Sequence, residues 1–218
     1  LQKDTARLMG SHRKFKQHGQ CGMWFSDALP HIADCADDIC MIQSMQTDQF
    51  NHHPGQLLMQ CGQAQFGLPS MGSWISYALG SENDNLPAFV SIAPSPGNGG
   101  ARNYGNAFLP PVHQGTTLGS AGRPATDAQV RNLVNHSLSK SEQQGQFELL
   151  RALNADQTSN KSGDKELEAV ISSYELAWRF QNNAPEILDL SRETEVTREM
   201  YGMDHKDTID FGSQCLMA

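Results

Sequence analysis

The chain has 218 residues, of which 38% are hydrophobic and 18% are charged, and its formal net charge is −8. This length is enough for one large α/β domain with a substantial core. The excess of acidic residues argues against a nucleic-acid partner, because binding to phosphates needs a positively charged stripe. No apolar run approaches the roughly 18 residues that a membrane span needs, so we expect no membrane-spanning segment.

The sequence at each end of the chain resembles a segment from the middle of a longer protein. It opens with LQKDTARLMG, without an initiator methionine or a signal peptide, and it stops within an apolar, helix-like pattern at FGSQCLMA. We therefore expect an internal fragment.

The first predicted elements are a short helix and a buried strand. Residues 24–36 include a suitable cap near their start, Ser26 or Asp27, and carry apolar residues on one helical face. In DDICMIQSM, residues 37–45, four consecutive apolar residues stand between polar ones. That pattern is typical of a strand covered on both faces, as in a parallel sheet.

Two helices and a second strand follow. Pro54 suits the first position of a helix that Gly62 ends. A second helix is predicted between the cap Ser70 and the stop Gly80, with an apolar face made of Met71, Trp74, Ile75, Ala78 and Leu79. LPAFVSIAP, residues 86–94, predicts the second buried strand. A strand–helix–helix–strand order favours an α/β sheet with a right-handed connection.

The second half of the chain is predicted to be irregular at first and then helical. Glycine, proline and asparagine dominate residues 95–125, which we expect to form a long irregular insertion. Residues 127–200 are expected to be mainly helical. Within them, 164–183 carry the strongest helical pattern, which should end before Pro185, and 197–202 predict a short helix.

A polar segment directly follows the first predicted strand. Ligands of open parallel sheets bind beyond the carboxyl ends of the strands, where helix N-termini offer N–H groups to an anion, and TDQFNHHPGQ, residues 47–56, occupies such a place. Thr47 could attack phosphorus or sulfur if a metal lowered its pKa, or could merely cap a turn. Asn51 could donate hydrogen bonds to the developing oxyanion, and Asp48 could ligate the metal.

Three further side chains are candidates for ligand contacts, and two of them, His52 and Arg102, are predicted to bind the substrate. His52 and His53 could bind zinc together with a cysteine, but adjacent histidines point in different directions and no HxH or HxxxH spacing accompanies them, so hydrogen-bonded turn residues are favoured. Arg102, in GNGGARNYG, could contact an anionic substrate, although this loop lacks the GK[ST] of a P-loop. The five cysteines form no CxxC framework, and we expect reduced thiols or at most one disulfide.

Several long segments, in order, resemble one protein family. They are FKQHGQCGMWFSDALPHIADCADDICMIQSMQTDQFNHHPGQLLMQCG, GLPSMGSWISYALGSENDNLPAFVSI, YELAWRFQNNAPEILDLSRET and FGSQCLMA. The family is the bacterial sulfatase-like proteins classed as a domain of unknown function, abundant in planctomycetes and their relatives. The resemblance covers nearly the entire chain and implies one partial domain over residues 1–218.

The resemblance implies an alkaline-phosphatase-like fold and chemistry. Members of that superfamily use two divalent metals, such as zinc or calcium, and a Ser, Thr or formylglycine nucleophile on a doubly wound sheet. In the nucleotide pyrophosphatase branch a nucleophilic threonine is soon followed by an Asn-His pair, and Thr47 with Asn51 and His52 is similar, with one residue more between threonine and asparagine. The superfamily's first-strand aspartate and later Asp and His ligands match nothing in this chain.

The resemblance thus implies a metal-dependent hydrolase that acts on small-molecule or saccharide esters of phosphate or sulfate, in the periplasm or outside the cell. Without most of the metal ligands, the isolated fragment is expected to be inactive. A non-catalytic binding or scaffolding protein with the same sheet is the alternative. A small zinc protein built on His52, His53 and a cysteine is a third.

Overall fold

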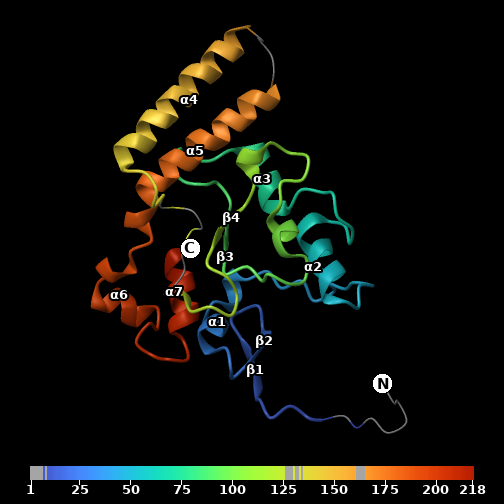
Figure 1. The fold of residues 1–218 in the computed structure, drawn as a ribbon. Helices are drawn as coiled ribbons and strands as arrows, with labels where there is room; N and C mark the ends of the chain where they lie inside the picture. The colour runs from blue at the N-terminus through green and yellow to red at the C-terminus, as the bar shows by residue number, and fades with distance from the viewer. Residues whose placement is uncertain (1–6, 8, 126–129, 131–132, 134, 161–164) are drawn as a thin grey trace. The chain divides into compact units, whose positions relative to one another are not determined.

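The structure, a computed structural model, describes residues 7, 9–125, 130, 133, 135–160 and 165–218 (Figure 1). The chain forms two compact units, residues 1–47 and 48–218. Helices and short sheets occur together, so the architecture is mixed α and β. No helix among the described residues has both the length and the apolar character needed to cross a membrane.

The first unit is built on an antiparallel hairpin. Strand β1 (Phe15–His18) pairs with β2 (Met23–Ser26), with Phe15 opposite Ser26 and His18 opposite Met23. A short helix α1 (Pro30–Asp34) and the 3₁₀ helix η1 (Ala36–Asp38) follow. Their core consists of the buried side chains of Phe25, Ala33 and Ala36, with Met23 and Ile39 packed against them.

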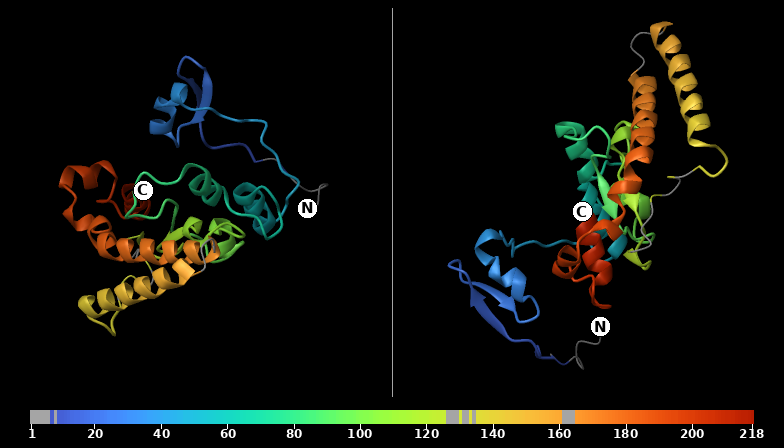
Figure 2. Two further views of the ribbon diagram at one scale, coloured as in Figure 1. Left: turned by 90° about the horizontal axis from the view of Figure 1, so that it is seen from above. Right: turned by 90° about the vertical axis from the view of Figure 1, so that its left-hand side faces the viewer.

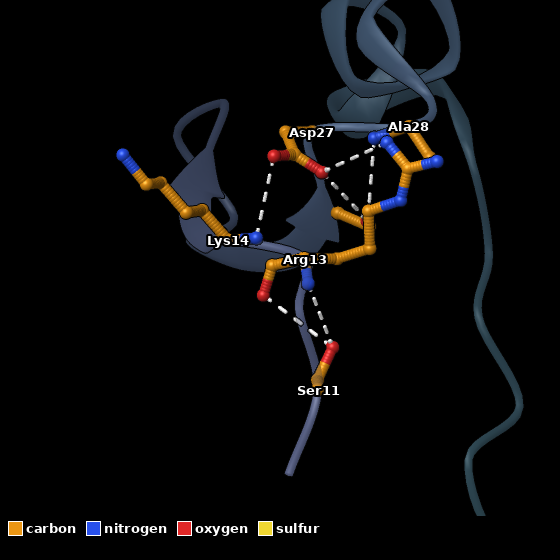
Figure 3. A network of polar contacts seen from close by, with 6 residues as sticks. Ser11, Arg13, Lys14, Asp27 and Ala28 are labelled. Atoms are coloured by element: carbon orange, nitrogen blue, oxygen red, sulfur yellow. Dashed lines mark hydrogen bonds and ion pairs between the residues drawn. The ribbon is translucent and has the colours of Figure 1, made fainter.

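Two aspartates fasten this hairpin at its two ends. At the open end, Asp27 Oδ2 accepts a hydrogen bond from the Lys14 N–H at 3.3 Å, and its Oδ1 lies 3.9 Å from a guanidinium nitrogen of Arg13 (Figure 3). At the turn, the Asp37 carboxylate accepts bonds from the N–H groups of Gln20 at 2.9 Å and Cys21 at 2.8 Å. These bonds hold the pKa of Asp37 below its usual range.

Two predictions for this unit need correction. The helix expected over residues 24–36 begins only at Pro30, because the residues before it pair in β2. The strand expected within residues 37–45 does not form, and the side chains of Met41, Ile42 and Met45 are 49%, 60% and 64% exposed. A strand needs a hydrogen-bonding neighbour, and the described residues of this segment pair with none.

The second unit opens with two capped helices. Helix α2 (His52–Cys61) begins after Asn51, whose Oδ1 accepts a hydrogen bond from the His53 N–H, and ends at Gly62 in a left-handed conformation. Helix α3 (Met71–Leu79) lies between the predicted cap Ser70 and the predicted stop Gly80. The boundaries predicted for α3 and the end predicted for α2 are confirmed, whereas α2 begins two residues before the predicted start at Pro54, because Asn51 caps it.

Helix α3 buries its hydroxyl-bearing side and exposes its apolar side. Ser70, Ser73 and Ser76 are at most 4% exposed, whereas Trp74 and Leu79 of the predicted apolar face are 41% and 83% exposed. The small serine side chains let the segments that contain Gly105 and His113 approach α3 closely. Ser73 Oγ donates to the Gly105 carbonyl at 3.1 Å, and Ser76 Oγ lies 2.8 Å from His113 Nδ1. Burial lowers the pKa of His113, which favours the neutral ring.

A two-stranded parallel sheet lies beside these helices. Strand β3 (Val90–Ile92) confirms the strand predicted over residues 86–94. Its partner is β4 (Thr116–Leu118), which lies in the segment predicted to be irregular, as do the 3₁₀ helices η2 (Gly100–Tyr104) and η3 (Pro111–His113). The described residues thus contain two separate two-stranded sheets, and the doubly wound sheet stays a prediction.

The C-terminal half is helical. Helices α4 (Lys140–Asn160) and α5 (Lys165–Ile187) lie side by side in both views of Figure 2. Between them, Phe147 stacks on Trp178 with ring centroids 5.3 Å apart. The elements η5 (Leu190–Arg192), α6 (Glu195–Met200) and α7 (Ile209–Met217) complete the chain, and α6 confirms the short helix predicted near it.

Helix α5 continues through Pro185, where the sequence predicted its end. Proline removes one N–H donor from a helix but leaves the following bonds possible. The Leu188 N–H still donates to the Ala184 carbonyl at 2.9 Å, and the Ala184 side chain is fully buried. The helix therefore continues past Pro185 although the proline lacks an N–H to donate, and the residue before the proline, Ala184, is packed against its surroundings.

Candidate functional site

The N-terminus of α2 carries the sequence-predicted polar residues. Asn51 Oδ1 is 3.3 Å from the His53 N–H that it caps, while Asn51 Nδ2 has no hydrogen-bond partner among the described residues. Asp48, Asn51 and His52 are all exposed. Because the first N–H groups of a helix lack intrahelical acceptors and stand at the positive end of its dipole, this end of α2 favours an anion.

Thr47, the predicted nucleophile, is exposed and is the last residue of the first unit. Its role stays a prediction from the sequence.

An aromatic ring links α2 to the arginine that the sequence singled out. The Arg102 guanidinium carbon lies 4.0 Å from the centroid of the Phe66 ring, and the His53 ring centroid lies 5.3 Å from that of Phe66. The structure therefore brings Arg102, from η2, into the neighbourhood of the first turn of α2. Sequence reasoning missed Phe66; an aromatic residue beside a loop glycine was the only signal.

The segment that carries Arg102 is fastened to α2 through its backbone. The Cys61 thiol, near the end of α2, donates to the Arg102 carbonyl with a sulfur–oxygen distance of 3.6 Å. Burial raises the pKa of Cys61, so the thiol keeps the proton that it donates. The Arg102 side chain itself makes no ion pair with any residue that the structure describes. It is therefore a cation available to a ligand.

Arg102 and Phe66 border a cavity of about 350 Å³. Its other polar side chains are already engaged: Gln114 Nε2 donates to the Tyr104 carbonyl at 3.0 Å, and Gln114 Oε1 accepts from the Asn106 N–H at 3.1 Å. Arg102 is the charged residue among those lining it. A guanidinium matches the geometry of phosphate and sulfate oxygens, so the cavity suits an oxyanion.

The two adjacent histidines are the first residues of α2 and not the turn residues that the sequence favoured, and they have different surroundings. His52 is exposed, whereas His53 is half-buried against Phe66 and its Nε2 is buried without a hydrogen-bond partner. Of the two, His53 contacts the Phe66 ring on which Arg102 stacks, and the substrate-binding role predicted for His52 stays a prediction.

Metal ligands do not gather in the described part of the chain. No three His, Cys, Asp or Glu side chains there are placed to hold a metal ion, which applies both to Asp48 and to the zinc site considered for His52 and His53. The described residues by themselves thus form no metal-ligand set. All five cysteines are free thiols, as predicted.

Comparison with known proteins identifies a family without an assigned activity. No curated protein and no solved structure matches the chain. Residues 2–218 match the family described as "Protein of unknown function (DUF1501)", and the chain therefore belongs to that family.

Proposed function

We propose that this chain supplies the anion-binding part of a sulfatase-like hydrolase of phosphate or sulfate esters. The observation that supports the proposal is the unpaired cation of Arg102, stacked on Phe66 beside the first turn of α2. The helix end offers N–H groups and the arginine offers charge, and each suits the oxygens of a tetrahedral anion.

The catalytic roles in this proposal come from the sequence and the family resemblance. Thr47 is the proposed nucleophile and Asn51 the proposed oxyanion donor, through its Nδ2. The proposal includes an alkaline-phosphatase-like sheet and two divalent metals, such as zinc or calcium, with Asp48 as a ligand. The proposed substrates are small-molecule or saccharide esters, encountered in the periplasm or outside the cell.

Anion binding is tested by calorimetric titration of the chain with inorganic phosphate and with sulfate. Arg102→Ala should weaken binding by about tenfold or more, because a charge-assisted hydrogen bond contributes roughly 1.5–3 kcal/mol. Arg123→Ala is the matched control, since Arg123 is also exposed but does not border the cavity. Equal affinity in the two variants, or no binding by the unmodified chain, would contradict the proposed anion site.

Hydrolysis is tested on the complete gene product with aryl phosphates and aryl sulfates, with zinc or calcium added. The proposal expects turnover that Thr47→Ala abolishes and that Thr47→Ser, which keeps a hydroxyl, partly retains. Turnover that survives Thr47→Ala would remove Thr47 from the nucleophile role.

A second candidate function is that of a non-catalytic binding or scaffolding protein. The exposed apolar face of α3 favours it, because large exposed apolar patches often mark surfaces for other proteins; this face includes Met71, Trp74 and Leu79, at 57%, 41% and 83% exposed. Anion binding without any turnover by the complete gene product would support this candidate over the hydrolase.

A further inference from the structure

A second cavity, of about 280 Å³, lies on another side of η2 and has a different chemistry. Its lining comes from α2, from β3 and the residues on either side of that strand, and from η2. Six of the lining side chains carry an amide or a hydroxyl group: Gln56, Gln60, Ser91, Ser95, Asn103 and Tyr104. None of the residues that line it is charged. The cavity therefore presents neutral hydrogen-bonding groups.

The position of this cavity is one where parallel sheets bind ligands. Ser95 follows the carboxyl end of β3, which pairs in parallel with β4. Ligands of parallel α/β sheets bind beyond that end of the strands. The wall contributed by Phe89 is held firmly, because a Cβ atom at Gly72 would lie only 2.5 Å from the Phe89 ring. Close packing thus fixes one apolar wall of the cavity.

The amide groups are oriented so that donors remain available. Asn103 Nδ2 donates to the Asn98 carbonyl at 2.9 Å and to Gln56 Oε1 at 3.2 Å. Because a backbone carbonyl can only accept, the Asn98 contact settles which end of the Asn103 amide is nitrogen. Gln56 therefore uses its oxygen, and its Nε2 is left without a partner among the described residues.

Gln60 lies one helical turn beyond Gln56, so both project from the same side of α2. The side chains of Gln60, Ser91 and Ser95 line the cavity and make no hydrogen bond within the part of the chain that the structure describes. The cavity thus combines unused donors and acceptors with the rings of Phe89 and Tyr104.

We infer that this cavity binds a neutral polyhydroxylated group, namely a carbohydrate. Hydroxyl groups of a sugar both donate and accept, as the amides and hydroxyls of the wall require, and the C–H faces of a sugar ring pack on aromatic rings. An anion is disfavoured because no cation lines the cavity. The inference does not depend on hydrolysis or on the Arg102 cavity.

The test is a titration of the isotope-labelled chain, followed by NMR, with four neutral probes: the methyl glycosides of glucose, galactose, mannose and xylose. At least one should shift the resonances of α2 and η2. Gln60→Leu should weaken that binding by about fivefold, the loss expected for about one neutral hydrogen bond. Ser95→Ala removes one hydroxyl group from an exposed residue and should also weaken glycoside binding, but by less than Gln60→Leu does.

Two control variants make the outcome specific. Gln63→Leu alters an exposed glutamine that does not line the cavity, and Arg102→Ala removes the cation of the other cavity; both should leave glycoside binding unchanged. Failure of all four glycosides to bind, or equal loss in Gln60→Leu and Gln63→Leu, would overturn the inference. Phosphate binding that persists in Gln60→Leu would show that the proposed anion site stands separately.

Discussion

Asn51 uses one end of its carboxamide to cap α2 and leaves the other end without a partner among the described residues. Its two proposed tasks can therefore be separated by substitution. The cap needs only an acceptor oxygen, whereas contact with an oxyanion needs the amide N–H groups.

Asn51→Ala should lower the free energy of unfolding by about 1 kcal/mol, because it removes the N-cap. Asn51→Asp keeps an acceptor and places a negative charge at the helix N-terminus, so it should retain the stability while it weakens phosphate binding. Urea denaturation and calorimetric titration measure the two effects. Unchanged phosphate affinity in Asn51→Asp would confine Asn51 to a structural role.

Asp37 should make the stability of the first unit depend on pH. Its pKa is lowered in the folded state by hydrogen bonds from the Gln20 and Cys21 N–H groups. The stabilisation is therefore complete above the usual pKa range of an aspartate and is lost as the pH falls through the lower folded-state pKa.

Unfolding measured by circular dichroism at a series of acidic pH values should show this loss. In Asp37→Asn, which cannot ionise, that part of the pH dependence should be absent. Parallel pH profiles for the two proteins would contradict the role assigned to the carboxylate.

At the level of single residues, the sequence located Asn51 and Arg102 but not the ring that joins their surroundings. Asn before a proline-containing helix start is a local signal, and so is an arginine in a glycine-rich loop. The contact of Phe66 with both His53 and Arg102 depends on how the loop after α2 folds back. Such a contact between distant positions has no local signature.

Among the elements, α3 shows how close packing depends on glycine. A Cβ atom at Gly72 would lie 2.5 Å from ring atoms of Phe89, whereas one at Gly145 in α4 would have nothing within 4 Å. Gly72→Ala should destabilise the protein by about 1–3 kcal/mol despite the better helix propensity of alanine. Gly145→Ala, the matched control, should stabilise it by at most about 1 kcal/mol.

Thermal unfolding of both variants checks this pair. Stabilisation by Gly72→Ala would mean that the Phe89 ring moves aside at little cost.

For α3, local signals predicted the two ends of the helix but not the side that it buries. Ser70 and Gly80 bound α3 because capping depends on residues next to the helix. Which side of α3 is buried depends on the approach of Gly105 and His113, both distant in the sequence, and the apolar periodicity indicated the other side. The strand predicted within 37–45 failed for a similar reason, since pairing is not a local property.

For the molecule as a whole, the division into two units near residue 47 bears on proteolysis. Residues 39–51 contain no helix or strand, and the Phe50 side chain is 99% exposed. Exposed segments without regular structure are the preferred sites of proteolytic cleavage. Brief treatment with chymotrypsin, which cleaves after aromatic residues, should therefore cut first after Phe50.

Mass spectrometry should identify fragments 1–50 and 51–218, and Phe50→Ser should suppress them. A first cut within α5 or α7 would contradict this prediction.

The mixed α and β character followed from the sequence, because strands and amphipathic helices leave separate periodic patterns. The division into two units did not, since it depends on which distant segments make contact.

Arg102 and Asn103 are consecutive residues of η2, yet they border different cavities. A ligand that stiffens or shifts this short helix from one cavity can alter the free energy of binding in the other. By thermodynamic reciprocity, the factor by which an oxyanion changes the affinity for a sugar equals the factor by which the sugar changes the affinity for the oxyanion. This short helix would then make the binding of the oxyanion and the binding of the sugar either cooperative or antagonistic.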